Sequence, residues 1–102
     1  MLELRPNCEH CDTNLAPNNT TTMICSYECT FCEECVKNVL KNVCPNCGGG
    51  FCYRPVRPSQ NIRNDNYLGK HPAKTVRILK PVVKDQHNLF ATNIRKIKPE
   101  DR

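Results

Sequence analysis

The sequence contains no tryptophan and only three phenylalanines and three tyrosines among its 102 residues. A chain this short and this poor in large apolar side chains buries too little surface to fold on a hydrophobic core alone, so it needs a further source of stability. No apolar run approaches the ~20 residues that span a bilayer, which predicts no membrane association. The first residues also lack the apolar stretch of a signal peptide, which favours the reducing cytoplasm as the location.

Several enzyme motifs are missing as well. The sequence has no glycine-rich phosphate loop, and no cysteine has a histidine partner at a position that the pattern fixes. It also shows no serine triad and no pair of carboxylates placed for acid–base chemistry. These absences argue against catalysis and against a small-molecule substrate.

What the chain has in abundance is cysteine. Of its nine cysteines, eight form three C-x2-C pairs and one C-x3-C pair: Cys8, Cys11, Cys25, Cys29, Cys32, Cys35, Cys44 and Cys47. A tight turn within each pair brings both sulfurs to the same side, and two tetrahedral zinc ions require eight such thiolates. In a reducing compartment the pairs indicate metal ligands rather than disulfides. The sequence therefore predicts two structural zinc ions, while an iron–sulfur cluster remains the alternative that thiolates alone do not exclude.

The eight thiols can be divided between two ions in two ways. Sequential pairing would crowd two dianionic centres together between Cys29 and Cys32, which are separated by only two residues. Interleaved pairing lets each ion join segments that are distant in the chain, so we favour it. It assigns Cys8, Cys11, Cys32 and Cys35 to site 1, and Cys25, Cys29, Cys44 and Cys47 to site 2.

Charge divides the chain into an acidic head and a basic tail. Residues 1–52 carry three basic and six acidic side chains, whereas residues 53–102 carry twelve basic and four acidic ones. We therefore expect a metal-binding head at about residues 1–57 and a basic tail at 58–102. The tail could follow a nucleic-acid backbone through Arg54, Arg57, Arg63, Lys70, Lys74, Arg77, Lys80 and Lys84. The same charges would equally serve to dock the tail on the acidic head or to solvate it, and both alternatives stay open.

Short elements of regular structure are predicted in the head. Residues 20–32 read as a β-hairpin, and residues 51–53 as a final short strand. Val36, Val39, Leu40 and Val43 recur at helical spacing, which indicates a helix that packs on the metal sites and the hairpin. Glycine after Cys47 allows positive φ, so that backbone N–H groups can point at sulfur.

The tail carries weaker signals. Alternation over residues 75–79 predicts a short strand, and apolar residues at helical spacing predict an amphipathic helix over residues 85–98. The ninth cysteine, Cys52, is expected to be a buried strand thiol rather than a ligand. His10 lies between two ligands and is expected to point away from the metal that they share.

Residues 8–47 resemble the ligand pattern of RING fingers, with Cys29 where that family usually has histidine. The resemblance implies a cross-braced pair of zinc sites. Glu9 and Gly48 depart from the residues that ubiquitin-ligase RING fingers usually carry there, so ligase activity is not carried over. Over most of its length the chain resembles a bacterial family of small cysteine-rich proteins of unknown function, through residues 2–8, 24–32, 44–49 and 71–75. That resemblance implies a bacterial, cytoplasmic protein and no particular activity.

Together these patterns predict a small metal-stapled α+β fold: a RING-like cross-brace with two structural zinc sites, a short hairpin and one helix, followed by a basic C-terminal tail. The function that fits best is a non-catalytic zinc-binding module that engages a protein or a nucleic acid. The alternatives are a RING-type ubiquitin-ligase-like component and a redox- or metal-sensing zinc protein.

Overall fold

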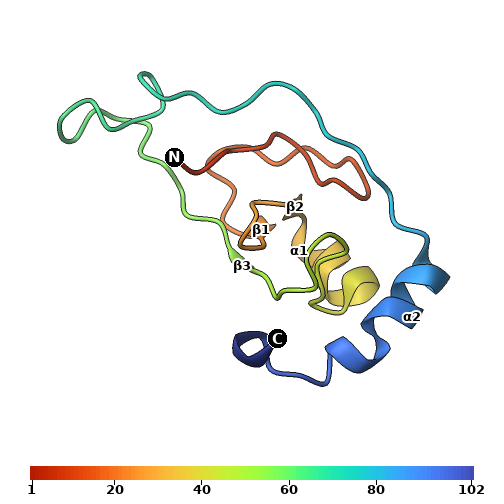
Figure 1. The fold of residues 1–102 in the computed structure, drawn as a ribbon. Helices are drawn as coiled ribbons and strands as arrows, with labels where there is room; N and C mark the ends of the chain where they lie inside the picture. Colours follow the sequence, from red (N-terminus) through yellow and green to blue (C-terminus); the bar gives the residue numbers. More distant parts are fainter.

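Regular structure is sparse in the computed structural model, which describes all of residues 1–102. A three-stranded sheet and two short helical regions are joined by long irregular segments (Figure 1). The elements are β1 (Met23–Ile24), β2 (Thr30–Phe31), α1 (Glu33–Cys35), the π-helical turn η1 (Val36–Leu40), β3 (Cys52–Tyr53), α2 (Lys84–Ile94) and the 3-10 turn η2 (Pro99–Asp101). The fold is therefore a small α+β arrangement, as predicted. No helix combines the length and the apolar character needed to cross a membrane.

The sheet confirms the predicted hairpin and the predicted final strand. Its order is β2-β1-β3, and both pairings are antiparallel. Met23 in the central strand lies opposite Phe31 on one side and Tyr53 on the other. Only two residues of each strand pair, so the sheet alone is too small to be stable.

The helix predicted from the apolar spacing over residues 36–43 does form, but it is short. It begins as α1 and continues as η1, in which the N–H of Lys41 bonds to the Val36 carbonyl. Lys41 and Asn42 then adopt left-handed conformations with φ of 54° and 57°, which ends the helix. Val36 and Leu40 are buried as predicted, whereas Val43 reaches the core from the turn beyond the helix.

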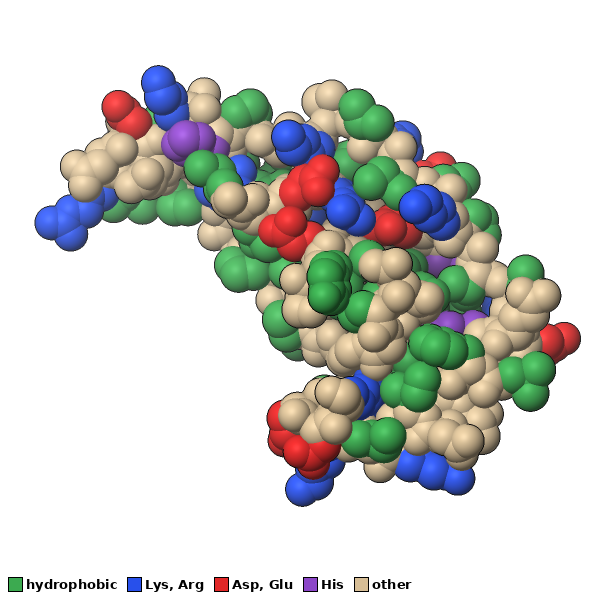
Figure 2. Space-filling model, viewed as in Figure 1, with side chains coloured by type: hydrophobic (Ala, Val, Ile, Leu, Met, Phe, Trp, Pro, Cys, Tyr) green, Lys and Arg blue, Asp and Glu red, His purple; other side chains and the backbone are tan.

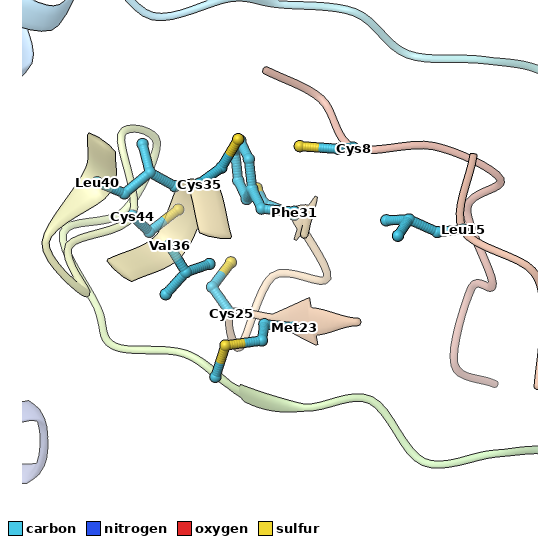
Figure 3. Close-up of a cluster of buried hydrophobic side chains, with 10 residues drawn as sticks. Cys8, Leu15, Met23, Cys25, Phe31, Cys35, Val36, Leu40 and Cys44 are labelled. Atoms are coloured by element: carbon cyan, nitrogen blue, oxygen red, sulfur yellow. The ribbon is translucent and has the colours of Figure 1, made fainter. Parts of the chain in front are cut away.

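Half of the main core cluster consists of cysteine. Its ten clustered side chains are Cys8, Leu15, Met23, Cys25, Cys29, Phe31, Cys35, Val36, Leu40 and Cys44 (Figure 3). Five thiols in ten core positions leave few apolar carbon atoms to bury. Thiols pack as small hydrophobes, but they bury less apolar surface than large side chains do. This cluster therefore needs a source of stability besides apolar burial.

The tail encircles the head. Figure 1 shows it leaving β3, running out to a projecting arm and returning along the N-terminal segment to α2. The arm comprises residues 58–71, and the Leu68 N–H closes it on the Pro58 carbonyl at 2.8 Å. Beyond the arm, the N–H groups of Lys74 and Lys80 donate to the carbonyls of Leu4 at 2.9 Å and Glu9 at 2.7 Å.

The strand predicted at residues 75–79 is wrong, and α2 ends earlier than predicted. The 75–79 segment forms no ladder, because the Ile78 N–H donates to the side chain of Asn7 at 3.2 Å instead of to a backbone carbonyl. The predicted helix over 85–98 spans Lys84–Ile94. It packs on η1 through His87, whose Nε2 donates to the Leu40 carbonyl at 2.8 Å.

Arg54 joins three segments of the head. It is 3% exposed, and its guanidinium donates to the carbonyls of Arg5 at 2.9 Å and Ala16 at 3.2 Å. Its own N–H donates to the Thr22 carbonyl at 2.7 Å. The N-terminal segment, the loop before β1 and the end of β3 are thereby held in one place.

We expect Arg54→Ala to lower the free energy of unfolding by about 3 kcal/mol, because a buried guanidinium that donates to two backbone carbonyls is lost. Arg63→Ala is the matched control, since Arg63 is exposed on the arm and its removal should change stability by no more than about 0.5 kcal/mol. Urea unfolding of both metal-loaded variants measures the difference. Equal midpoints would show that Arg54 does not stabilise the head.

Candidate metal centres

The first group of thiols has the dimensions of a zinc site. The sulfurs of Cys8, Cys11, Cys32 and Cys35 all lie within 4.8 Å of one another. A tetrahedron with four zinc–sulfur bonds of about 2.3 Å has edges of about 3.8 Å. The Cys11 and Cys32 sulfurs are 3.8 Å apart, which matches that edge. The group therefore suits a tetrahedral ion held by four thiolates.

Two local structures bring these four thiols together. Cys8 and Cys11 lie on a tight turn, in which the Asp12 N–H donates to the Cys8 carbonyl at 2.9 Å and Asp12 has φ of 65°. Cys32 is the N-cap residue of α1 and Cys35 is its last residue. The helical spacing of Cys32 and Cys35 directs both sulfurs toward the turn that carries Cys8 and Cys11. Figure 3 shows the sulfurs of Cys8 and Cys35 pointing at each other.

The second group contains three thiols, those of Cys25, Cys44 and Cys47, also within 4.8 Å of one another. Each sulfur accepts a backbone N–H, from Tyr27 at 3.3 Å, from Asn46 at 3.4 Å and from Gly49 at 3.4 Å. Gly48, with φ of 77°, makes the last of these contacts possible, as the sequence predicts. Donors aimed at sulfur stabilise the thiolate form and orient the ligands.

Cys29 departs from the prediction because its sulfur lies outside this three-thiol group. Cys29 is nevertheless buried in the same core cluster, where a negative charge on its sulfur contributes to raising the pKa of Cys44. The pair that it forms with Cys25 has one residue more than a C-x2-C pair. The longer spacing includes a left-handed turn at Glu28, whose φ is 65°, just before the chain enters β2.

Burial opposes ionisation of the thiols when no cation is present. It raises the pKa of Cys35 and that of Cys44, in both cases reinforced by the charges of neighbouring thiolates. Burial also raises the pKa of Cys32. Cys11 is exposed, and there the opposing effect of hydrogen bonds from the Thr13 N–H and from neighbouring thiols outweighs burial and lowers the pKa. A divalent cation would supply the positive charge that the buried thiolates lack.

The two groups contain seven of the eight cysteines as interleaved pairing divides them, all but Cys29, and sequential pairing would require different neighbours. Cys52 belongs to neither group. It lies on β3, but it is exposed rather than buried as expected. His10 also lies outside both groups, and its Nδ1 accepts the Val82 N–H at 3.0 Å.

The predicted nucleic-acid contacts divide into two classes. Arg54 does not fit that role, because its side chain is buried. Arg57 donates to the carbonyls of His71 and Leu2, and Arg77 donates to Asp12 and Asn14. The other five are exposed and outside the ion pairs of the structure: Arg63, Lys70, Lys74, Lys80 and Lys84.

Two buried polar residues that organise the site were missed by the sequence analysis. Asn7 is fully buried, and its amide donates to the carbonyls of Cys8 and Ile78 and to Asp12. Glu9 is 5% exposed and accepts both the Arg5 guanidinium and the Thr30 N–H. Neither residue type nor spacing distinguishes them from solvated polar residues in a single sequence.

With both groups of thiols defined, the chain can be compared with known proteins. A family model described as "Protein of unknown function (DUF1272)" matches residues 1–57, more than half of the chain. The chain belongs to the DUF1272 family. An uncharacterised protein of Rhizobium meliloti (strain 1021) is 51% identical over 81 residues, which cover 79% of this chain and 89% of the relative. No solved structure matches the chain. The expected resemblance to a bacterial cysteine-rich family of unknown function is confirmed.

For this DUF1272 chain we expect Cys32→Ser to lose the ion of the first group and the native near-ultraviolet spectrum, because one ligand of a closed four-thiol set is gone. Cys52→Ser is the matched control, since Cys52 lies in neither group, and it should keep all of its metal. Elemental analysis of both purified variants measures the metal content. Full metal content in Cys32→Ser would contradict the assignment of the first group.

Proposed function

We propose that this protein is a non-catalytic zinc-binding interaction module. In this proposal two structural zinc ions, held in an interleaved cross-brace, fix the head, and the head and tail together offer a surface to another macromolecule. The observation that carries it is the first thiol group, whose four sulfurs lie within 4.8 Å of one another, with the Cys11 and Cys32 sulfurs at the tetrahedral edge distance of 3.8 Å. Zinc is favoured because four thiolates in a tetrahedron are its usual structural ligands.

In the second site we assign Cys29 as the fourth ligand. Its burial in one cluster with Cys25 and Cys44 supports this role, as does the bond from the Cys25 N–H to the Cys29 carbonyl at 3.2 Å, which holds the two residues side by side. Four thiolates leave no coordination position for water or substrate, so both ions would support the fold rather than perform chemistry.

The arrangement of the tail argues against the ubiquitin-ligase alternative. In the RING-like pattern, the positions of Glu9 and Gly48 belong to the surface that recruits a conjugating enzyme. Here Glu9 is buried, and its carbonyl is bound by the tail at Lys80. Gly48 is buried too, and Phe90 of α2 lies 3.7 Å from where its Cβ would be. One observation supports the alternative of a redox- or metal-sensing role: the thiols of Cys11 and Cys47 are exposed to solvent.

We expect the protein to bind two zinc ions, and cobalt substituted for zinc should show the intense visible bands of tetrahedral thiolate coordination at both sites. Cys29→Ser should change the spectrum of one site only and weaken that site by at least tenfold, because an oxygen donor replaces a thiolate. Titration of both proteins with cobalt, followed by zinc competition, makes the measurement. An unchanged spectrum in Cys29→Ser would exclude Cys29 as a ligand, and iron in the purified protein would exclude zinc.

Nucleic acid is the second candidate partner. Five of the predicted basic contacts are exposed and free of acidic partners, which is what phosphate binding needs. Figure 2 shows, however, that basic side chains on the visible face are scattered among acidic ones and form no continuous stripe. This distribution makes a protein partner the better supported of the two.

If the tail does follow a phosphate backbone, the logarithm of the binding constant for mixed-sequence duplex DNA should fall linearly with the logarithm of salt concentration, by about 0.9 per phosphate contact. Replacing Arg63, Lys70 and Lys74 with alanine should then reduce the slope by about 2.7. Lys41→Ala, which removes an exposed charge from the head, is the control. We expect instead no measurable DNA binding at physiological salt, and the full slope would overturn that expectation.

A further inference from the structure

The four thiols of the first group differ in their access to solvent. Cys8 and Cys35 are 0% and 7% exposed, whereas Cys11 is exposed and Cys32 is half-buried. A cysteine is oxidised where its sulfur is a thiolate that solvent can reach. In a four-thiolate zinc site every ligand is a thiolate, so access to solvent selects Cys11 and Cys32 as the two that an oxidant meets.

These two thiols are also close enough to react with each other. Their sulfurs lie 3.8 Å apart, and a disulfide bond measures about 2.05 Å. The sulfurs would therefore have to approach by about 1.8 Å. Cys11 belongs to a surface turn in which residues 11–14 are all exposed, so the turn can shift toward Cys32 without disturbing the core.

The second group offers no comparable pair. Cys47 is its exposed member, whereas Cys25 and Cys44 are 3% and 0% exposed. Cys29, assigned above as the fourth ligand, is 9% exposed and belongs to the core cluster. An oxidant that reached Cys47 would find every possible partner thiol inside the core. The two groups should therefore differ in their sensitivity to oxidation.

The turn that carries Cys11 is also a point where the tail is attached to the head. The Asp12 carboxylate accepts the Arg77 guanidinium at 2.8 Å, and the Asn14 side chain accepts it at 2.6 Å. These contacts lie at the surface, where the side chains of Arg77 and Asp12 are 42% and 44% exposed. A shift of the turn would therefore break them, and a change in the first group would reach the tail.

We propose that the first thiol group is a peroxide-sensitive switch: a hydroperoxide joins Cys11 and Cys32 in a disulfide, and the site releases its ion. The inference rests on the proposed function, for which it names a means of regulation. The disulfide would keep Cys32 tied to the N-terminal turn, so β2 would stay held at that end and the second site would keep its ion. Oxidation would then change the attachment of the tail without unfolding the head.

Two steps complete the oxidation. The Cys11 thiolate attacks the terminal oxygen of the hydroperoxide, the O–O bond breaks with its electron pair on the leaving alkoxide, and Cys11 becomes a sulfenic acid. The Cys32 thiolate then attacks the Cys11 sulfur, so that the S–S bond forms, the S–O bond breaks and hydroxide leaves. The two thiolates lose two electrons, the hydroperoxide gains them, and water protonates the alkoxide. Cys8 and Cys35 remain, which is too few ligands for a closed structural zinc site.

The test is oxidation of the zinc-loaded Cys52→Ser chain with hydrogen peroxide, because this variant lacks the one exposed thiol outside both groups. A chromogenic chelator counts the released zinc. Cleavage after Glu9 and Glu33 separates the members of each C-x2-C pair in the first group, so mass spectrometry can identify the disulfide. We expect one zinc ion released per chain and a bond between Cys11 and Cys32, both reversed when dithiothreitol and zinc are added.

Histidine substitutions separate metal binding from oxidation, because histidine can replace a thiolate in a zinc site but cannot form a disulfide. Cys11→His in the same chain should keep two ions and release zinc into peroxide at least about tenfold more slowly than the parent. Cys47→His is the matched change in the second group, and it should release one ion at the parent's rate, within about twofold.

Trypsin reports the effect on the tail. We expect oxidation to accelerate cleavage after Arg77 at least about threefold, because its contacts with the turn are lost. Cleavage after Arg63 should keep its rate, since no hydrogen bond joins the arm to that turn. Equal rates after Arg77 before and after oxidation would contradict the release of the tail.

Three results would overturn the switch itself: no zinc released from protein that contains two ions, loss of both ions in a single phase, or a disulfide that lacks Cys11 or Cys32. Protein that contains no zinc before oxidation contradicts the proposed function instead. Should Cys11→His fail to bind two ions, the zinc count and the disulfide map of the parent chain decide the outcome.

Discussion

In the proposed zinc-binding module, the attraction between thiolates and a shared cation is the interaction on which the fold depends. The sheet pairs only two residues in each strand, and half of the clustered core side chains are cysteines. Such a core gains little from apolar burial, and burial alone makes its thiols harder to ionise. A divalent ion at each group would reverse that cost, because it would stabilise the thiolates and tie their segments together.

Interleaving then turns two local sites into one structure. The first group joins the N-terminal turn to α1, and the second joins the turn after β1 to the turn that contains Cys44 and Cys47. β2 lies between Cys29 and Cys32, so with Cys29 as the proposed fourth ligand the strand that carries Phe31 would be held at both ends. Loss of either ion would therefore release β2, and the two sites should not behave as independent units.

The sequence predicted the parts of the fold that depend on residue type and spacing, and it failed where the partner is distant. The cysteine pairs, the hairpin and the glycine beside Cys47 each follow a local rule. The strand predicted at 75–79 does not form, because the Ile78 N–H bonds to Asn7, 71 residues away, and just beyond it the Val82 N–H bonds to His10, 72 residues away. Arg54 resembles a solvated cation in the sequence, whereas its acceptors lie 49 and 38 residues away. No local pattern specifies such partners.

The tail completes a surface that the head does not have alone. A hollow of about 520 Å³ beside Tyr27 and Pro45 is also lined by residues 78, 80 and 82 of the tail, beyond the residues 1–57 that the family model matches. The 81 residues shared with the Rhizobium meliloti relative outnumber those of the head, so part of the tail belongs to that similarity. Tyr27 and Pro45 follow Cys25 and Cys44 in the turns of the second thiol group, and the tail residues line the same hollow. If the protein acts as the proposed interaction module, a change in the tail would therefore alter its surface without altering the two groups of thiols.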